Sequence, residues 1–106
     1  MDVEFEIAGR LVVWDENKAE INRRKHGVTF ETAVEVFLDR NRIEDFDELH
    51  SDYEERYRIL GKVENVLVVI CTDRQEKTRL ISARRANKFE EEQYYGQYSD
   101  LPWNEN

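Results

Sequence analysis

Apolar and acidic residues alternate at the start of the chain. Val3, Phe5 and Ile7 alternate with acidic residues, which is the period of a strand with one buried face. Gly9-Arg10 would turn the chain into a second strand, Leu11-Val12-Val13-Trp14. The pattern therefore predicts an N-terminal pair of strands.

Two helices are predicted next, separated by a short junction. Asp15 suits the N-cap of a helix from Glu16 to about Lys25, and Gly27 suits the position after it, where a left-handed backbone costs least. Thr29 suits the N-cap of a second helix over Phe30 to Leu38. The apolar face of that helix would consist of Phe30, Ala33, Val34, Phe37 and Leu38.

The remaining chain predicts mostly strands. A short edge strand over residues 41–46 is followed by an acidic loop over 47–52. Turn residues then separate three strands, which predicts an antiparallel meander over about 54–60, 66–72 and 78–84. A last helix would run from Asn87 to about Tyr98, with a loosely ordered tail at 99–106.

Composition limits the class of protein. A chain of 106 residues with 40% hydrophobic residues predicts one folded domain over residues 1–106, of α+β class. No apolar run approaches the roughly 20 residues that span a bilayer, and no signal peptide is recognisable at the N-terminus. The single cysteine, Cys71, lies in an apolar run and is predicted to be buried. We therefore expect a cytoplasmic protein with no membrane partner.

The net charge of −8 argues against a nucleic-acid partner. The bases, however, are concentrated in three short stretches, which the fold could bring together. They are Arg23-Arg24-Lys25, then Arg56 and Arg58, then Arg79, Arg84 and Arg85.

The junction after the first helix is the main candidate for proton-transfer chemistry. The chain has two histidines, and one of them, His26, follows Lys25 at the predicted helix end. Cations there interact favourably with the helix dipole, which could explain both residues without any function. The functional alternative makes His26 a general acid or base and Lys25 a phosphate ligand.

Strand periodicity groups the arginines by face. Arg56 and Arg58 are two apart and should share a face. In the last strand, strict alternation places Leu80, Ser82 and Arg84 on one face. It places Arg79, Ile81, Ala83 and Arg85 on the other. Such arginines could cover a solvated sheet face or bind phosphate.

The second histidine, His50, lies in the acidic loop near Asp47 and Asp52, where a mobile loop residue is the default interpretation. The spacing matches no metal-ligand motif, and no phosphate-binding glycine loop is present, so we expect no metal and no cofactor. Glu90-Glu91-Glu92 is interpreted as a solvated helix face.

Three blocks of residues resemble the BrnT toxin family. The first is Trp14-Asp15, Lys18, Asn22, Lys25-His26-Gly27-Val28-Thr29-Phe30-Glu31 and Ala33. The second is His50-Ser51, Glu55-Arg56-Tyr57 and Gly61, and the third is Ile81-Ser82-Ala83-Arg84-Arg85-Ala86. The blocks occur in the family's order over roughly residues 12 to 95, whereas residues 1–11 form an N-terminal extension with an extra strand.

The resemblance implies a RelE-like fold, with two N-terminal helices packed on an antiparallel sheet and one C-terminal helix. It also implies the toxin of a type II toxin–antitoxin pair, a ribonuclease that inhibits translation. A BrnA-type antitoxin with a ribbon-helix-helix segment would neutralise the toxin and bind operator DNA, so that the toxin meets DNA only indirectly. The substrate would be RNA, with mRNA as the candidate.

The implied cleavage is metal-independent, with the RNA 2′-hydroxyl attacking the neighbouring phosphate. The expected catalytic residues are His26, Lys25, Arg56, Arg79, Arg84 and His50. The expected RNA-binding residues are Arg58, Arg85 and Tyr57, with core packing favoured over base stacking for Trp14. The alternative is a non-catalytic or weakened toxin-like module that acts mainly as antitoxin partner and operon co-repressor, because a charge of −8 suits a basic protein partner.

Overall fold

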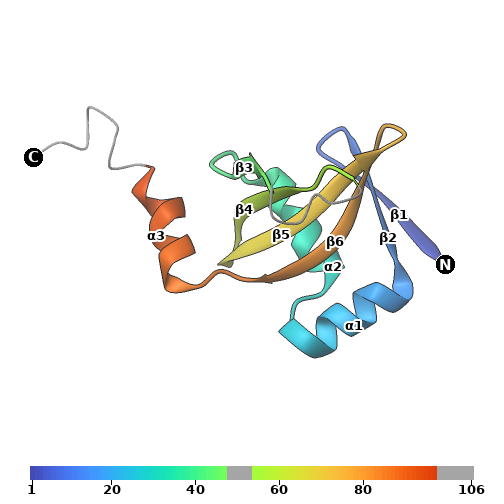
Figure 1. Cartoon of the computed structure of the whole chain (residues 1–106), viewed down its shortest axis with the longest axis horizontal. Coiled ribbons are helices and arrows are strands. Elements are labelled where there is room, and N and C mark those ends of the chain that lie inside the picture. Colours follow the sequence, from blue (N-terminus) through green and yellow to red (C-terminus); the bar gives the residue numbers. More distant parts are fainter. Residues whose placement is uncertain (48–53, 98–106) are drawn as a thin grey trace, which may run out of the picture.

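The computed structural model describes residues 1–47 and 54–97. Within them six strands form one sheet in the order β1-β2-β6-β5-β4-β3, shown in Figure 1. The strands are β1 (Asp2–Ile7), β2 (Arg10–Asp15), β3 (Ile43–Phe46), β4 (Tyr57–Val63), β5 (Asn65–Arg74) and β6 (Lys77–Arg85). The helices are α1 (Glu16–His26), α2 (Phe30–Ala33), the 3₁₀ helix η1 (Val34–Leu38) and α3 (Lys88–Gly96). No helix among the described residues is long and apolar enough to cross a membrane.

The N-terminal predictions are confirmed. β1 pairs antiparallel with β2 along its whole length, across a turn in which Ala8 and Gly9 have positive φ. The Asp15 side chain caps α1 by accepting a hydrogen bond from the Lys18 N–H at 3.0 Å. Gly27 ends the helix with a φ of 72°, a conformation that glycine adopts without a steric cost.

The second helix spans the predicted residues, but it is not α-helical throughout. Thr29 is its N-cap as predicted, but the α-helical turn ends at Ala33 and η1 continues the chain. In a 3₁₀ helix, residues three apart lie on one side. Val34 and Phe37 therefore both face the core, whereas Leu38 is 59% exposed and leaves the predicted apolar face.

The sheet is mixed, not purely antiparallel. The meander of β4, β5 and β6 is confirmed, and β3 adds to its edge antiparallel to β4. β2, however, pairs with β6 in parallel, at Val12↔Thr78 and Val13↔Arg79. Alternation predicts which side chains share a face, but strand order depends on where the intervening chain packs, which local pattern does not encode.

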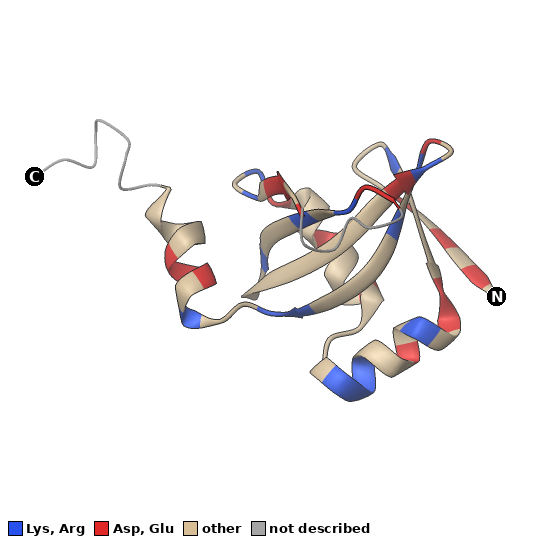
Figure 2. Ribbon diagram, in the orientation of Figure 1, with Lys and Arg blue, Asp and Glu red and all other residues tan. Residues whose placement is uncertain are grey.

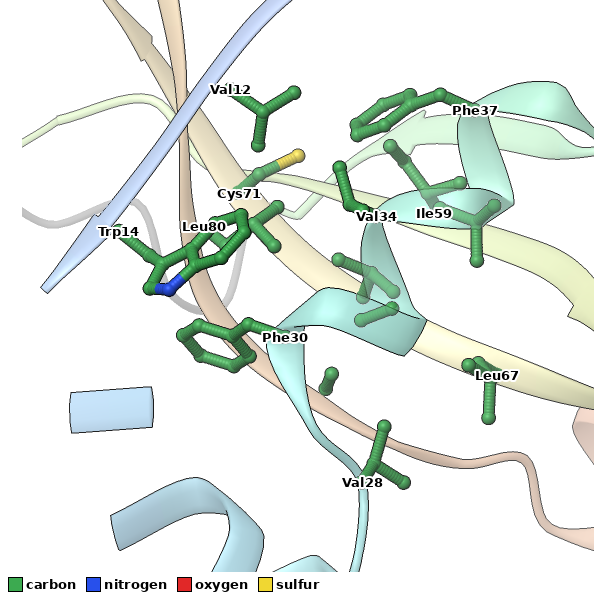
Figure 3. Packing of buried hydrophobic residues seen from close by; sticks show 14 residues of the cluster. Val12, Trp14, Val28, Phe30, Val34, Phe37, Ile59, Leu67, Cys71 and Leu80 are labelled. Carbon is green, nitrogen blue, oxygen red and sulfur yellow. The ribbon is translucent and has the colours of Figure 1, made fainter. Parts of the chain in front are cut away.

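The main core lies between the sheet and the α2–η1 segment. Trp14 packs edge-on against Phe30 with ring centroids 6.0 Å apart, which confirms that this tryptophan is a core residue (Figure 3). Cys71 is fully buried among these side chains, also as predicted. η1 packs closely on β4, since a Cβ added at Gly61 would lie 2.7 Å from the Val36 Cβ.

The opposite face of the sheet is covered only in part. A second cluster places Tyr94 of α3 against Leu60, Val66 and Val68. Figure 1 shows that α3 extends from one end of the sheet, so α3 covers this face only at that end. The predicted tail at 99–106, and most of the loop at 47–52, lie outside the described residues.

The side chain of Asn22 attaches α1 to the edge of β6. Its Oδ1 accepts the Ala83 N–H at 3.0 Å, and its Nδ2 donates to the Ala83 carbonyl at 2.8 Å and to the Val28 carbonyl at 3.0 Å. β2 pairs with β6 only near the start of β6, at Thr78 and Arg79. At Ala83 the Asn22 amide therefore takes the place of a neighbouring strand. The residue is 6% exposed, and these bonds satisfy polar groups that water does not reach.

Replacing Asn22 with alanine should therefore destabilise the fold strongly. Asn22→Ala leaves the buried groups of Ala83 and Val28 without partners, which should lower the free energy of unfolding by about 2–4 kcal/mol. Denaturant unfolding measures the change. Asn17→Ala, at an exposed position on the same helix, is the matched control and should change it by less than about 0.5 kcal/mol; equal effects would contradict the assigned role.

Cys71 should be inert in the native protein. Burial raises the pKa of its thiol to about 12, so the reactive thiolate is scarce at pH 8. A thiol reagent at pH 8 should label the folded protein only through unfolding, at least about 100-fold more slowly than the protein in denaturant. Absorbance of the reagent measures the rate. Rapid labelling of Cys71 in the folded protein would show that the core opens at β5.

Candidate functional site

A cavity of about 650 Å³ opens on the face of the sheet opposite α2 and η1. Side chains alternate along the strands, so that Ile59, Val69 and Ala83 point to the main core, while their neighbours Arg58, Val68 and Arg84 point to the cavity. The lining is His26, Asp45, Phe46, Asp47, Arg56, Arg58, Val68, Ile70, Ile81, Ser82 and Arg84. Its walls come from α1, β3, β4, β5 and β6.

His26 reaches the cavity because of the way α1 is attached. It lies four residues after Asn22, on the same side of the helix, and Asn22 is bonded to β6. His26 is half-buried, whereas Lys25 is exposed and does not line the cavity. The structure therefore brings one of the two junction residues into the site.

Arg84 enters the cavity from β6 and is held by Glu90 of α3. Its Nη1 and Nη2 each donate to one oxygen of the Glu90 carboxylate at 2.8 Å, and Nη1 also donates to the Arg85 carbonyl at 3.2 Å. Hydrogen bonding to Arg84 holds the pKa of Glu90 below its usual range, so the carboxylate stays ionised. Glu90 is 7% exposed, so its interpretation as part of a solvated face was wrong, although Glu91 and Glu92 are exposed.

Arg58 of β4 and Arg56, directly before β4, also line the cavity. The prediction that they share a face is confirmed, because both line the cavity. Arg58 Nε and Nη2 donate to the Asp45 carboxylate at 3.1 and 2.8 Å, and Nη2 also donates to Gln93 at 3.2 Å. The hydrogen bond with Asp45 raises the pKa of Arg58, which remains a cation.

Besides Lys25, three more predicted site residues do not line the cavity. Arg79 is bound by Asp2 of β1, with nitrogen–oxygen distances of 3.3 and 2.7 Å. Arg85 donates to Asn65 at 3.0 Å, and Tyr57 donates through its hydroxyl to Asp73. The pKa of Tyr57 is raised, by burial first and then by that carboxylate. His50 lies outside the described residues.

A β-bulge in β6 corrects the predicted grouping by face. Ile70 is opposite Ser82 and the next residue, Cys71, is opposite Leu80, so Ile81 is the extra residue. Leu80 and Ala83, predicted on opposite faces, consequently both lie in the main core. Ile81, Ser82 and Arg84 all line the cavity. The assignment by strict alternation was therefore wrong for Leu80 and Ile81, but Ser82 and Arg84 share a face as predicted.

Figure 2 shows basic residues at the last turn of α1 and the end of β6, with acidic residues on α3. The cavity can position a phosphate between arginine cations with a histidine at its wall, as phosphoryl chemistry requires. Among the described residues, no three of the histidine, cysteine and acidic side chains are grouped as metal ligands.

Two residues that shape the site were missed in the sequence. Glu90 had a detectable signal: Asn87 and Glu90 have the spacing of a capping box, which the structure contains. The signal for Asn22 was weaker, because the sequence does not show whether a polar residue in a helix faces the sheet or the solvent.

Comparison with known proteins supports one family. The family model described as the ribonuclease toxin BrnT of type II toxin–antitoxin systems matches residues 14–90. The crystal structure of the ribonuclease toxin BrnT from Brucella abortus is similar, at a TM-score of 0.54 and 26% identity, over 71% of this chain and 94% of that one. A comparison with curated proteins finds no match.

β1 lies wholly before the matched residues and α3 continues beyond them. The cavity residues His26, Arg58 and Arg84 all fall inside them. A match of this length establishes the relationship: the chain belongs to the BrnT family of ribonuclease toxins of type II toxin–antitoxin systems.

Proposed function

We propose that this protein is a metal-independent endoribonuclease that acts as the toxin of its pair. The observation that carries the proposal is the convergence of His26, Arg56 and Arg84 on one cavity from three separate parts of the chain. Residues far apart in the sequence are gathered there with the groups that phosphodiester cleavage needs.

The reaction begins when a base removes the proton of an RNA 2′-hydroxyl. The 2′-oxygen attacks the adjacent phosphorus, the bond to the 5′-oxygen breaks, and that oxygen takes up a proton. The products are a 2′,3′-cyclic phosphate and a 5′-hydroxyl. His26 carries the proton transfer in this proposal, while Arg84 and Arg56 stabilise the charge that develops on the phosphate oxygens. Arg58, bound to Asp45, contributes positive potential to the same wall.

The partner in this proposal is a BrnA-type antitoxin that covers the toxin and carries the DNA-binding segment. RNA, with mRNA as the candidate, is the substrate, and its cleavage inhibits translation in the RelE-like manner. The net charge of −8 favours a basic antitoxin surface, because opposite charge speeds association and suppresses wrong partners.

One observation favours the alternative of a non-catalytic module. Two of the cavity arginines are already bound by carboxylates, Arg58 by Asp45 and Arg84 by Glu90. If those pairs exclude phosphate, the protein acts only through its antitoxin. Antitoxin binding without any RNA cleavage would establish this alternative.

Expression without antitoxin should arrest growth. His26→Ala or Arg84→Ala should relieve the arrest, because each removes a cavity group that the chemistry needs. Arg79→Ala is the matched control: it removes one arginine from the same strand, outside the cavity, and should leave the arrest intact. Growth curves after induction measure the effect. Relief by Arg79→Ala alone would instead place the active centre beside Asp2.

Purified protein should cut single-stranded RNA at low salt in the presence of a chelator that removes divalent cations. His26→Ala should lower kcat by about 10²- to 10⁴-fold, the range for a lost general acid or base. A substrate with 2′-deoxy residues should resist cleavage, and mass spectrometry should find the cyclic phosphate. Cleavage that requires an added divalent cation, or that yields a 5′-phosphate, would refute the proposed chemistry.

A further inference from the structure

The contacts of Arg84 leave one edge of its guanidinium open. Of its five N–H groups, Glu90 takes the pair between Nη1 and Nη2, and the Arg85 carbonyl takes another on Nη1. The Nε–H and the outer Nη2–H remain, and they have no partner among the described residues. These two groups form a fork that matches two phosphate oxygens.

Arg58 in the same cavity has the opposite arrangement. Asp45 binds its Nε and Nη2, which is the edge that Arg84 keeps open, and Gln93 binds Nη2 as well. The two arginines are thus not equivalent. Arg58 joins β4 to β3 and α3, whereas the fork of Arg84 has no partner in the part of the chain that the structure describes.

Glu90 is itself held firmly. Its Oε1 accepts both the Asn87 N–H at 2.9 Å and Arg84 Nη1 at 2.8 Å, while its own N–H donates to Asn87 Oδ1 at 2.8 Å. The start of α3 and the orientation of Arg84 therefore depend on one carboxylate. Gln93, one turn further along α3, accepts a single hydrogen bond from Arg58 at 3.2 Å.

We propose that Glu90 is a positioning residue that aims the open fork of Arg84 at an RNA phosphate. This inference rests on the proposed function and adds α3 to the site. Glu90 binds only the far edge of the guanidinium, so it fixes the direction of the fork without occupying it. An acidic side chain that merely competed with phosphate would instead occupy the fork, as Asp45 does on Arg58.

Glu90→Gln tests the proposal in the full-length protein. Glutamine keeps the acceptor that the capping box needs, but it cannot accept both guanidinium bonds. With single-stranded RNA as substrate, we expect kcat to fall about 10- to 100-fold, the scale of a misplaced catalytic group. The charge of Arg84 is kept, so the salt dependence of KM should not change.

Glu91→Gln is the matched control, since it removes the same charge from the same turn at an exposed position. It should leave kcat unchanged. A rise in cleavage with Glu90→Gln would overturn the proposal, because it would show that Glu90 inhibits the site. No difference between the two variants would overturn it as well.

A double-mutant cycle separates positioning from a general loss of structure. In an Arg84→Gln background, Glu90→Gln should have no further effect on kcat, whereas independent losses would multiply and overturn the proposal. Arg84→Lys, which keeps the charge but not the fork, should match the Glu90→Gln loss. Wild-type activity in Arg84→Lys would refute the role of the fork in binding phosphate, even if the Glu90→Gln variant failed to fold.

A binding measurement keeps this inference distinct from the proposed function. If the wild-type protein does not cut RNA, the proposed function fails. The affinity of the protein for a 2′-deoxy oligonucleotide still tests whether the fork of Arg84 binds phosphate. Glu90→Gln should then weaken binding about 10-fold relative to Glu91→Gln, from one misaligned bidentate phosphate contact. Equal affinities would overturn the inference on its own.

Discussion

The bonds between Asn22 and Ala83 are the constraint on which the site depends. β6 has β5 on one side throughout, but β2 on the other side only near Thr78 and Arg79. Where β2 leaves, the Asn22 amide pairs with both backbone groups of Ala83. A helix is thereby attached to a sheet edge at a defined register, and its last turn carries His26 to the cavity. Without these bonds the edge of β6 would need water or another strand.

The second constraint is the balance of charge inside the cavity. The arginine cations of β4 and β6, which lie on either side of β5, repel one another, and carboxylates on the flanking elements offset this repulsion. Asp45 of β3 binds Arg58 and Glu90 of α3 binds Arg84, each through two nitrogen–oxygen contacts. Bidentate pairs of this kind fix orientation as well as charge. Acidic residues on a solvated helix would repel RNA, but one acidic residue of α3, Glu90, instead pairs with Arg84 inside the site.

Local structure could be predicted from the sequence wherever one residue determined it. Asp15, Gly27 and Thr29 perform the expected cap roles, since a cap depends on its own turn. The parallel pairing of β2 with β6 and the bulge at Ile81 could not be predicted, because each depends on packing between distant segments. The bulge has a large effect on the predicted site, because one extra residue reverses the sheet face of every side chain beyond it. Of the candidate residues, His26, Arg56, Arg58 and Arg84 meet, but Arg79 does not.

Arg79 also shows how an acidic protein can keep a basic site. The extension before the matched family residues forms β1, whose Asp2 and Glu4 bind Arg79 and Lys77. β1 is four strands from β4, or about 19 Å at a strand spacing of about 4.8 Å, in the sheet order observed. At physiological ionic strength, exposed charges are screened beyond about 8 Å. The carboxylates of β1 therefore add to the net charge of −8 while having little effect on a phosphate beside Arg58. Net charge governs which partner approaches the molecule, and the local pairs govern what the cavity binds.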